Sequence, residues 1–241
     1  MEFQKSKWHG FERLGFNFEG RNAILVCPEK PCSDKKWLYK TEYFEAFPSF
    51  EIEMLKRGYY VAHLSNKSRL CPTEDTDIRP EFCEFLQAQF GLNKKCLPVG
   101  MSCGGMQAVY FAAKYPQYVA ALYIDAPVLN LLSWPLGLGN SKGACPEEFK
   151  RDIGMSVSEM LNYRNHPIDC KETLLKSGIP IFMICGDSDI TVPYEENGKI
   201  LSDYFKANNG NLTEILKKGC DHHPHGLDDY TPLLDFVKKY Y

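Results

Sequence analysis

The stretch Gly100-Met101-Ser102-Cys103-Gly104 decides the fold of this chain. It has the pattern G-x-S-x-G and lies between an apolar run at residues 96–99 and a run rich in Ala and Met that stays uncharged as far as Lys114. The first run predicts a buried strand and the second a buried helix, so the pattern predicts a sharp strand–turn–helix. Glycines at both ends let strand and helix approach closely, which exposes the Oγ of Ser102. The alternative is a glycine-rich turn that only packs tightly or binds an anion at the helix N-terminus.

Short apolar runs and helical patterns alternate along the chain on both sides of this turn. Strands are predicted at residues 23–26, 59–64, 96–99, 120–124, 179–185 and 212–216, with a further strand or hairpin at 8–18. Helices are predicted at residues 50–57, 80–90, 102–115, 195–208 and 232–240. This alternation predicts the α/β class: a mostly parallel sheet covered by helices on both faces.

The alternation fails between Asp125 and Lys176. Trp134-Pro135-Leu136-Gly137 has the composition of a loop, and residues 146–163 carry only helical patches. No internal repeat or linker divides the chain. The sequence therefore predicts a single domain over residues 1–241 with a short helical cap inserted at about 127–176.

Composition excludes several classes of partner. The 28 Lys and Arg residues against 31 Asp and Glu residues give a net charge of −3, which provides no general attraction to nucleic acids or anionic membranes. No apolar run approaches the roughly 20 residues of a transmembrane helix, and the N-terminal residues lead into no signal-peptide core. We therefore expect no nucleic-acid or membrane partner and a cytoplasmic location.

Cofactor motifs are also missing from the sequence. There is no G-x-x-x-x-G-K-[ST] phosphate loop and no G-x-G-x-x-G after the first strand, so no cofactor is expected. The ten cysteines are scattered without a C-x-x-C pair, which indicates neither a zinc site nor a disulfide framework. Buried free thiols in a reducing compartment are the preferred interpretation.

A candidate acid follows the predicted strand at residues 179–185. A serine hydroxyl becomes a nucleophile when a histidine accepts its proton, and that histidine needs a carboxylate partner. The loop Gly186-Asp187-Ser188-Asp189-Ile190-Thr191-Val192-Pro193 supplies two carboxylates where open α/β sheets place their sites. Asp187 and Asp189 are both candidates, and the other one would cap the following helix.

A candidate base lies in the loop Gly219-Cys220-Asp221-His222-His223-Pro224-His225-Gly226, which holds three of the six histidines. A base with two supporting histidines is the favoured interpretation. A metal site is the alternative, because imidazoles this close can hold a divalent ion. No carboxylate–histidine motif elsewhere completes such a site, so no metal is expected. The isolated His9, His63 and His166 are interpreted as structural.

These three segments, in the order Ser, Asp, His, resemble the α/β-hydrolase superfamily over nearly the whole chain. The closer likeness is to bacterial serine esterases associated with glycan breakdown, in which a Gly-x-Gly-His-His-Pro-His-type loop closes the domain. Asp221 replaces a glycine of that loop, and Cys103 stands where the family often has Arg or Gln. The resemblance implies Ser102 as nucleophile, Asp189 of a G-x-x-D-x-x-V-P loop as acid, and His222 as base, with Asp187 and His225 in reserve.

The resemblance implies a serine hydrolase that cleaves an acyl or acetyl ester, on a carbohydrate or another small molecule, through an acyl-enzyme. A peptidase or thioesterase with the same triad, or a non-catalytic binding protein of this fold, are the alternatives. The oxyanion would be bound by the N–H of Cys103 and by a second N–H after the strand at residues 23–26. Pro28 has no N–H to give, so Glu29 is the expected second donor.

Two further expectations concern the surroundings of this site. Trp37, Tyr39 and Trp134 are interpreted as loop aromatics that either bind substrate or cover the core. Four cysteines adjoin the predicted catalytic segments, which predicts loss of activity on thiol alkylation; they are Cys27, Cys103, Cys185 and Cys220.

Overall fold

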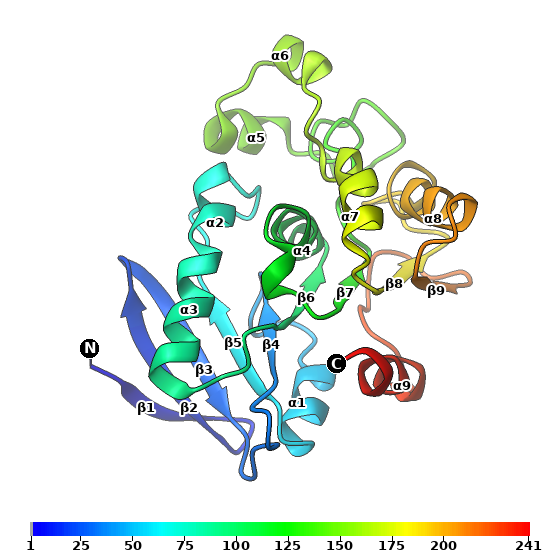
Figure 1. Cartoon of the computed structure of the whole chain (residues 1–241). Helices are drawn as coiled ribbons and strands as arrows, with labels where there is room; N and C mark the ends of the chain where they lie inside the picture. The colour runs from blue at the N-terminus through cyan, green and yellow to red at the C-terminus, as the bar shows by residue number, and fades with distance from the viewer. Residues whose placement is uncertain (1) are drawn as a thin grey trace.

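The computed structural model describes residues 2–241 and contains one nine-stranded sheet of order β1-β2-β3-β5-β4-β6-β7-β8-β9 (Figure 1). The strands are β1 (Gln4–Trp8), β2 (Phe11–Phe18), β3 (Arg21–Cys27), β4 (Trp37–Lys40), β5 (Tyr60–Leu64), β6 (Leu97–Met101), β7 (Leu122–Asp125), β8 (Ile181–Gly186) and β9 (Leu212–Lys217). The α-helices are α1 (Ser49–Lys56), α2 (Thr73–Asp77), α3 (Arg79–Phe90), α4 (Cys103–Lys114), α5 (Pro146–Ile153), α6 (Val157–Asn162), α7 (Lys171–Ser177), α8 (Gly198–Ala207) and α9 (Thr231–Tyr240).

The sheet is mostly parallel, as predicted. Strands β5, β4, β6, β7, β8 and β9 pair in parallel, while β1, β2 and β3 form an antiparallel extension at one edge. The carboxyl ends of the parallel strands therefore meet along one edge, where the turn at Ser102 lies after β6. Because β3 is antiparallel to β5, the chain leaves β3 at the opposite edge.

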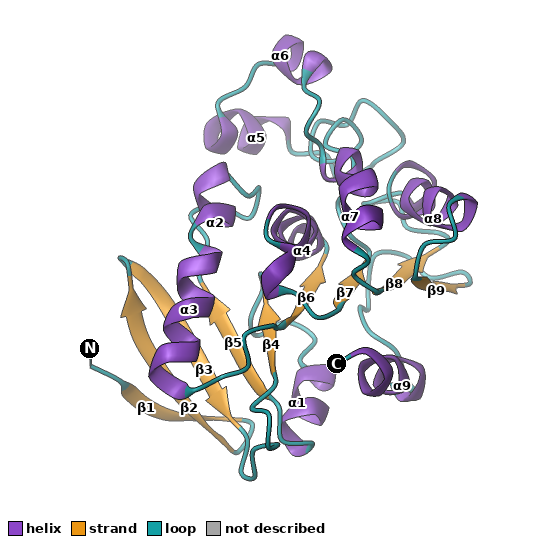
Figure 2. Ribbon diagram, in the orientation of Figure 1, coloured by secondary structure: helices purple, strands orange, loops and turns teal. Residues whose placement is uncertain are grey.

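Helices cover both faces of the sheet, which confirms the predicted layering (Figure 2). On one face α3, α4, α7 and α8 bury an apolar cluster that includes Phe82, Phe111 and Phe205. On the other face α1 and α9 bury a second cluster, with Phe50 and Phe236 among its members. Within residues 2–241, no helix has both the length and the apolar character that crossing a membrane requires.

One central strand is absent from the prediction. Residues that were expected to form a substrate loop instead form β4, between β5 and β6. Both faces of β4 are buried, so its sequence shows no alternation of polar and apolar residues. The lysines around it indicate an exposed loop instead. Lys40 is itself buried and forms a 2.5 Å ion pair with Glu51 of α1.

The segment predicted as a cap contains two different parts. Helices α5 and α6 lie beyond the carboxyl edge of the sheet, above α2 and α4 in Figure 1. They enclose a third apolar cluster that includes Trp134, Phe149 and Met160. Helix α7 instead packs on the sheet layer, where Leu174 joins the cluster of α4 and α8. The part that stands above the site is therefore shorter than residues 127–176.

Candidate active site

Ser102 occupies a strained turn between β6 and α4. Its backbone has φ 53° and ψ −118°, a conformation that costs free energy in any residue with a side chain. A Cβ atom on Gly100 would overlap the carbonyl of Gly104, so only glycine lets the strand and the helix come this close. The strain holds the hydroxyl clear of the helix, at the edge where the parallel strands end.

Asp189 lies in the loop that follows β8, and it is buried. Its Oδ1 accepts the backbone N–H groups of Thr191 (2.9 Å) and Val192 (2.7 Å). Its Oδ2 lies 2.7 Å from Nδ1 of His222. Since a carboxylate only accepts hydrogen bonds, these contacts fix its orientation and place the imidazole proton on Nδ1.

His222 completes a hydrogen-bonded chain of three side chains. Its Nε2 lies 3.0 Å from Oγ of Ser102, while Nδ1 is held by Asp189. With the proton on Nδ1, the Nε2 lone pair of the neutral ring faces the hydroxyl proton. The structure thus brings together the three residues to which the resemblance gave the roles of nucleophile, acid and base.

Asp221 joins the two loops that carry Asp189 and His222. Its Oδ1 accepts the N–H groups of Ile190 (3.0 Å) and His222 (2.7 Å). These two backbone donors hold the pKa of Asp221 below its usual range. A Cβ on Gly186 would overlap the carbonyl of Cys220, so the loops also touch through their backbones.

Asp187 and His223 lie outside the hydrogen-bonded chain. Asp187 is exposed, and its Oδ1 accepts the N–H of Gly219 at 2.6 Å, which makes it a brace between loops. His223 is exposed and stacks on Phe47 at 5.5 Å. Of the alternatives that the sequence left open, Asp189 and His222 are the two that form a hydrogen-bonded series with Ser102.

The predicted oxyanion donor Glu29 is wrong. It follows β3, whose carboxyl end lies at the opposite edge of the sheet. There the N–H of Cys32 donates to the carbonyl of Gly58, the residue two positions before β5 begins. The error comes from the missing strand: the loop beside Ser102 follows β4, not β3.

The loop after β4 lies against the first turn of α4. Thr41 Oγ1 donates to the carbonyl of Gly104 at 2.7 Å, and the backbone nitrogen of Glu42 lies 3.5 Å from the position of a Cβ on Gly104. The N–H of Cys103, at the first position of α4, has no acceptor within its own helix. The N–H of Cys103, next to Ser102, and the backbone N–H of Glu42, beside the first turn of α4, are thus the two candidate oxyanion donors.

The comparisons with known proteins agree with this architecture. A family model described as alpha/beta hydrolase fold matches residues 65–154, the region that contains Ser102. The structure also superposes on the acylaminoacyl peptidase of Pyrococcus horikoshii with a TM-score of 0.67 and 16% identity, over 91% of this chain and 37% of that one. This chain has the α/β-hydrolase fold.

Two further hydrolase structures differ in how much of their length matches. Dipeptidyl peptidase 4 of Porphyromonas gingivalis has a TM-score of 0.71 and 15% identity, over 100% of this chain and 35% of that chain. An S-formylglutathione hydrolase from Agrobacterium tumefaciens has a TM-score of 0.62 and 14% identity, over 92% of this chain and 93% of that chain. The chain thus spans a little over one third of the two peptidases and nearly all of the third hydrolase.

The three aromatic residues expected at the substrate site are buried in this hydrolase fold. Trp37 and Tyr39 belong to β4 and have no exposed surface, so their assignment to substrate binding is wrong. The indole N–H of Trp37 donates to the carbonyl of Asn93 at 2.8 Å. Trp134 is also buried: its indole N–H donates to Gly143 at 2.8 Å, and the guanidinium of Arg69 covers the ring at 5.3 Å.

A second carboxylate–histidine pair lies beside the first, and sequence reasoning missed it. Asp125, the last residue of β7, accepts from Nδ1 of His225 at 2.8 Å and from the N–H of Gly226 at 2.7 Å. The signal was present, because Asp125 ends the strand next to the one that leads to Ser102. The pair supplies the carboxylate partner whose absence had argued against a metal at the three histidines.

Proposed function

We propose that this chain is a serine hydrolase that cleaves carboxylic esters. The observation that carries the proposal is the hydrogen-bonded chain from Ser102 through His222 to Asp189. In the first step His222 Nε2 accepts the hydroxyl proton while Oγ attacks the ester carbonyl, and Asp189 stabilises the imidazolium that results.

The tetrahedral intermediate carries a negative charge on the former carbonyl oxygen. The N–H groups of Cys103 and Glu42 would donate to it, in a preorganised arrangement that costs no rearrangement during the reaction. The intermediate then collapses: its carbonyl re-forms, the carbon–oxygen bond to the leaving alcohol breaks, and His222 gives its proton to the departing oxygen. The same base next activates water, which hydrolyses the acyl-enzyme and regenerates Ser102.

A small ester or thioester is the substrate class that we propose, with a peptide as the alternative. The solved structures of this fold include both an S-formylglutathione hydrolase and peptidases, so both substrate classes are tested below. The net charge of −3 is compatible with an uncharged substrate. Within this class, an acyl or acetyl ester on a carbohydrate is the substrate that we propose to test first, and it requires neither cofactor nor partner protein.

Active-site labelling tests the proposal directly. A fluorophosphonate probe should label the wild-type protein, and both Ser102→Ala and His222→Ala should abolish labelling. Ser188→Ala is the matched control, because the hydroxyl of this exposed serine donates only to its neighbour Asp187. Equal labelling of Ser102→Ala would remove Ser102 as nucleophile, and a folded wild-type protein that takes no label would favour a non-catalytic binding protein.

A substrate panel then tests the reaction class. We expect turnover of p-nitrophenyl acetate and acetylated sugars, with Ser102→Ala and His222→Ala lowering kcat by several orders of magnitude. Acyl-thioesters and peptide amides are measured in parallel. Faster turnover of the amides than of the esters would replace the esterase assignment with a peptidase.

A further inference from the structure

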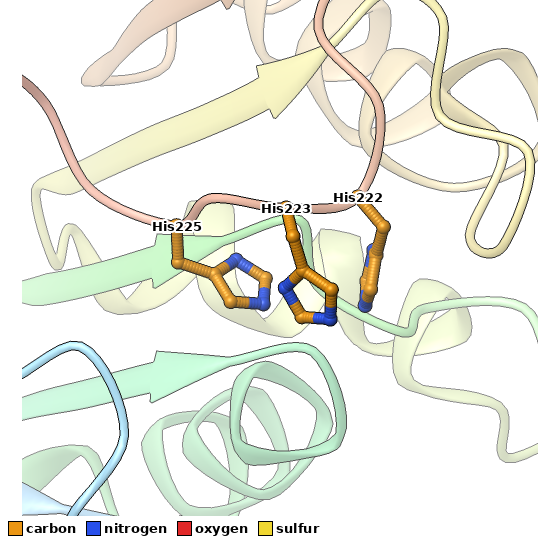
Figure 3. A group of neighbouring side chains, drawn as sticks. All are labelled: His222, His223 and His225. Atoms are coloured by element: carbon orange, nitrogen blue, oxygen red, sulfur yellow. The ribbon is translucent and has the colours of Figure 1, made fainter.

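The histidine loop gathers three imidazoles at one place. One ring nitrogen from each of His222, His223 and His225 lies within 4.8 Å of the other two. Figure 3 shows the rings side by side on one stretch of chain, projecting in the same direction. The proposed triad uses only His222, so the other two rings call for a separate explanation.

Two of these rings are oriented by buried carboxylates. Asp189 accepts from Nδ1 of His222 and Asp125 accepts from Nδ1 of His225, at 2.7 and 2.8 Å. With Nδ1 of each ring donating to its carboxylate, the remaining lone pair lies on Nε2, and in His222 this lone pair faces the hydroxyl of Ser102. Histidines that bind metals are usually oriented through the second nitrogen, by a carboxylate, a backbone carbonyl or a water.

The carboxylates are themselves held in place. Asp125 has 1% exposure, and its Oδ2 accepts the N–H of Gly226 (2.7 Å) and the hydroxyl of Tyr123 (3.2 Å). Such an anchored carboxylate fixes both the tautomer and the direction of its histidine. Both Nε2 lone pairs are therefore preorganised before any ion arrives.

The third ring, His223, is placed by an aromatic contact. It stacks on Phe47 with an interplanar angle of 16°, and Phe47 also meets the edge of His225 at 5.2 Å. The ring centroid of His223 lies 4.9 Å from those of both His222 and His225, so the stacking holds the third imidazole beside the other two.

The spacing suits a transition-metal ion after a small adjustment. Zinc binds imidazole nitrogens at about 2.0–2.1 Å, so three such ligands in a tetrahedron lie about 3.3 Å apart. Ligand atoms now within 4.8 Å of one another would therefore approach by up to about 1.5 Å when the ion binds. Three neutral nitrogens favour zinc and related divalent ions over magnesium or calcium, which prefer oxygen ligands.

We propose that His222, His223 and His225 form a binding site for Zn²⁺ that reversibly inhibits the enzyme. The ion takes the Nε2 lone pair of His222, the same lone pair that must accept the proton of Ser102. One site thus has two exclusive uses, proton transfer or metal binding. The inhibitory consequence rests on the proposed function, whereas the metal site itself does not.

Binding is measured first, without reference to activity. Co²⁺ serves as the spectroscopic probe and Zn²⁺ as the ion for calorimetry, each titrated into the full chain. We expect one ion per chain and the visible absorption of tetrahedral Co²⁺ with nitrogen ligands. Thiolate charge-transfer bands would instead place the ion on some of the ten free cysteines and overturn the proposal.

Variants assign the site. His223→Ala removes a ligand and should abolish binding. Asp125→Asn removes only the carboxylate behind His225 and should weaken Zn²⁺ binding by about 10- to 100-fold. His9→Asn is the matched control, because His9 is an exposed histidine that lies outside this cluster. Wild-type affinity in His223→Ala would overturn the proposal.

Activity measurements then separate the two hypotheses. In the wild-type enzyme, Zn²⁺ should inhibit ester hydrolysis at the concentrations at which it binds, and EDTA should restore the rate. Ser102→Ala should still bind the ion, since it keeps all three histidines. If the chain binds Zn²⁺ but hydrolyses no ester, the proposed function fails and the metal site stands. If the enzyme is active and neither binds nor responds to Zn²⁺, the metal site fails alone.

Discussion

Gly105 is the position in α4 where a methyl group should do the most damage. A Cβ there would lie 2.5 Å from Cβ and 2.8 Å from Cα of Pro127, distances that real side chains do not reach. The loop cannot move away freely, because its backbone is bonded on both sides of Pro127. The N–H of Ala126 donates to Ile184 at 2.8 Å, and the N–H of Val128 donates to the carbonyl of Ser102 at 3.1 Å.

Gly104 is the matched control, and it is the glycine that the G-x-S-x-G pattern names. A Cβ on Gly104 would lie 3.2 Å from the Cβ of Glu42 and from the Oγ1 of Thr41, so a shift of a few tenths of an ångström relieves the contact. Either alanine gains about 1 kcal/mol of helix propensity. Overpacking costs about 3 kcal/mol at Gly105 and about 1 kcal/mol at Gly104. The expected free energies of unfolding therefore differ by about 2 kcal/mol between the two variants.

Urea unfolding followed by circular dichroism measures this difference. With an m-value of about 3 kcal/mol/M, Gly105→Ala should have a midpoint about 0.7 M below that of Gly104→Ala. The rate of ester hydrolysis should also be lower in Gly105→Ala, because displacement of the loop breaks the hydrogen bond from the N–H of Val128 to the carbonyl of Ser102. Equal midpoints for the two variants would refute the reasoning.

Three further outcomes are expected. Asp189→Asn should lower kcat/KM by about 10⁴-fold, because an amide favours the wrong tautomer of His222. Asp187→Asn is the control and should change kcat/KM little. Comparable losses in the two variants would contradict the assignment of Asp189 as the acid. Burial raises the pKa of Cys103 to about 12, so iodoacetamide at about pH 8 should leave this thiol unmodified in the folded protein. Peptide mass mapping that finds Cys103 alkylated in folded protein would disprove this. Burial lowers the pKa of His63 below 6.5, so the unfolded chain binds a proton that the folded chain refuses. The free energy of unfolding should therefore be unaffected by His63 above pH 6.5 and should fall below it, by at most about 1.4 kcal/mol per pH unit. Urea unfolding at several pH values measures this, and a His63→Gln variant whose free energy of unfolding has the same pH slope as the wild type would contradict it.

Much of the fold follows from local patterns. The strand–turn–helix at Ser102 and most of the parallel strands can be predicted from sequence, because each is a run of a few residues with its own composition. Strand β4 was missed for a physical reason: it is buried on both faces and bounded by lysines, so its four residues carry neither alternation nor length. Because this strand was omitted, Trp37 and Tyr39 were assigned to a substrate loop, and the second oxyanion donor was sought after β3 instead of after β4.

The candidate site likewise has features that follow from local sequence and features that depend on long-range contacts. Sequence alone determined the residue types and their order, a serine at a glycine-flanked turn, then a carboxylate loop, then a histidine loop, because each is a short motif at the end of a strand. Which carboxylate meets which imidazole depends on contacts across 120 positions for Ser102 and His222 and 33 for Asp189 and His222.

Only the tertiary structure decided those contacts. Parallel pairing brings the ends of β6, β7 and β8 to one edge, so that Ser102, Asp125 and Asp189 all face the histidine loop. The second carboxylate–histidine pair arises there as well, from two residues 100 positions apart with no shared motif. Local sequence can specify a strand and the turn that follows it, but neighbours across a sheet are fixed by the packing of the whole chain.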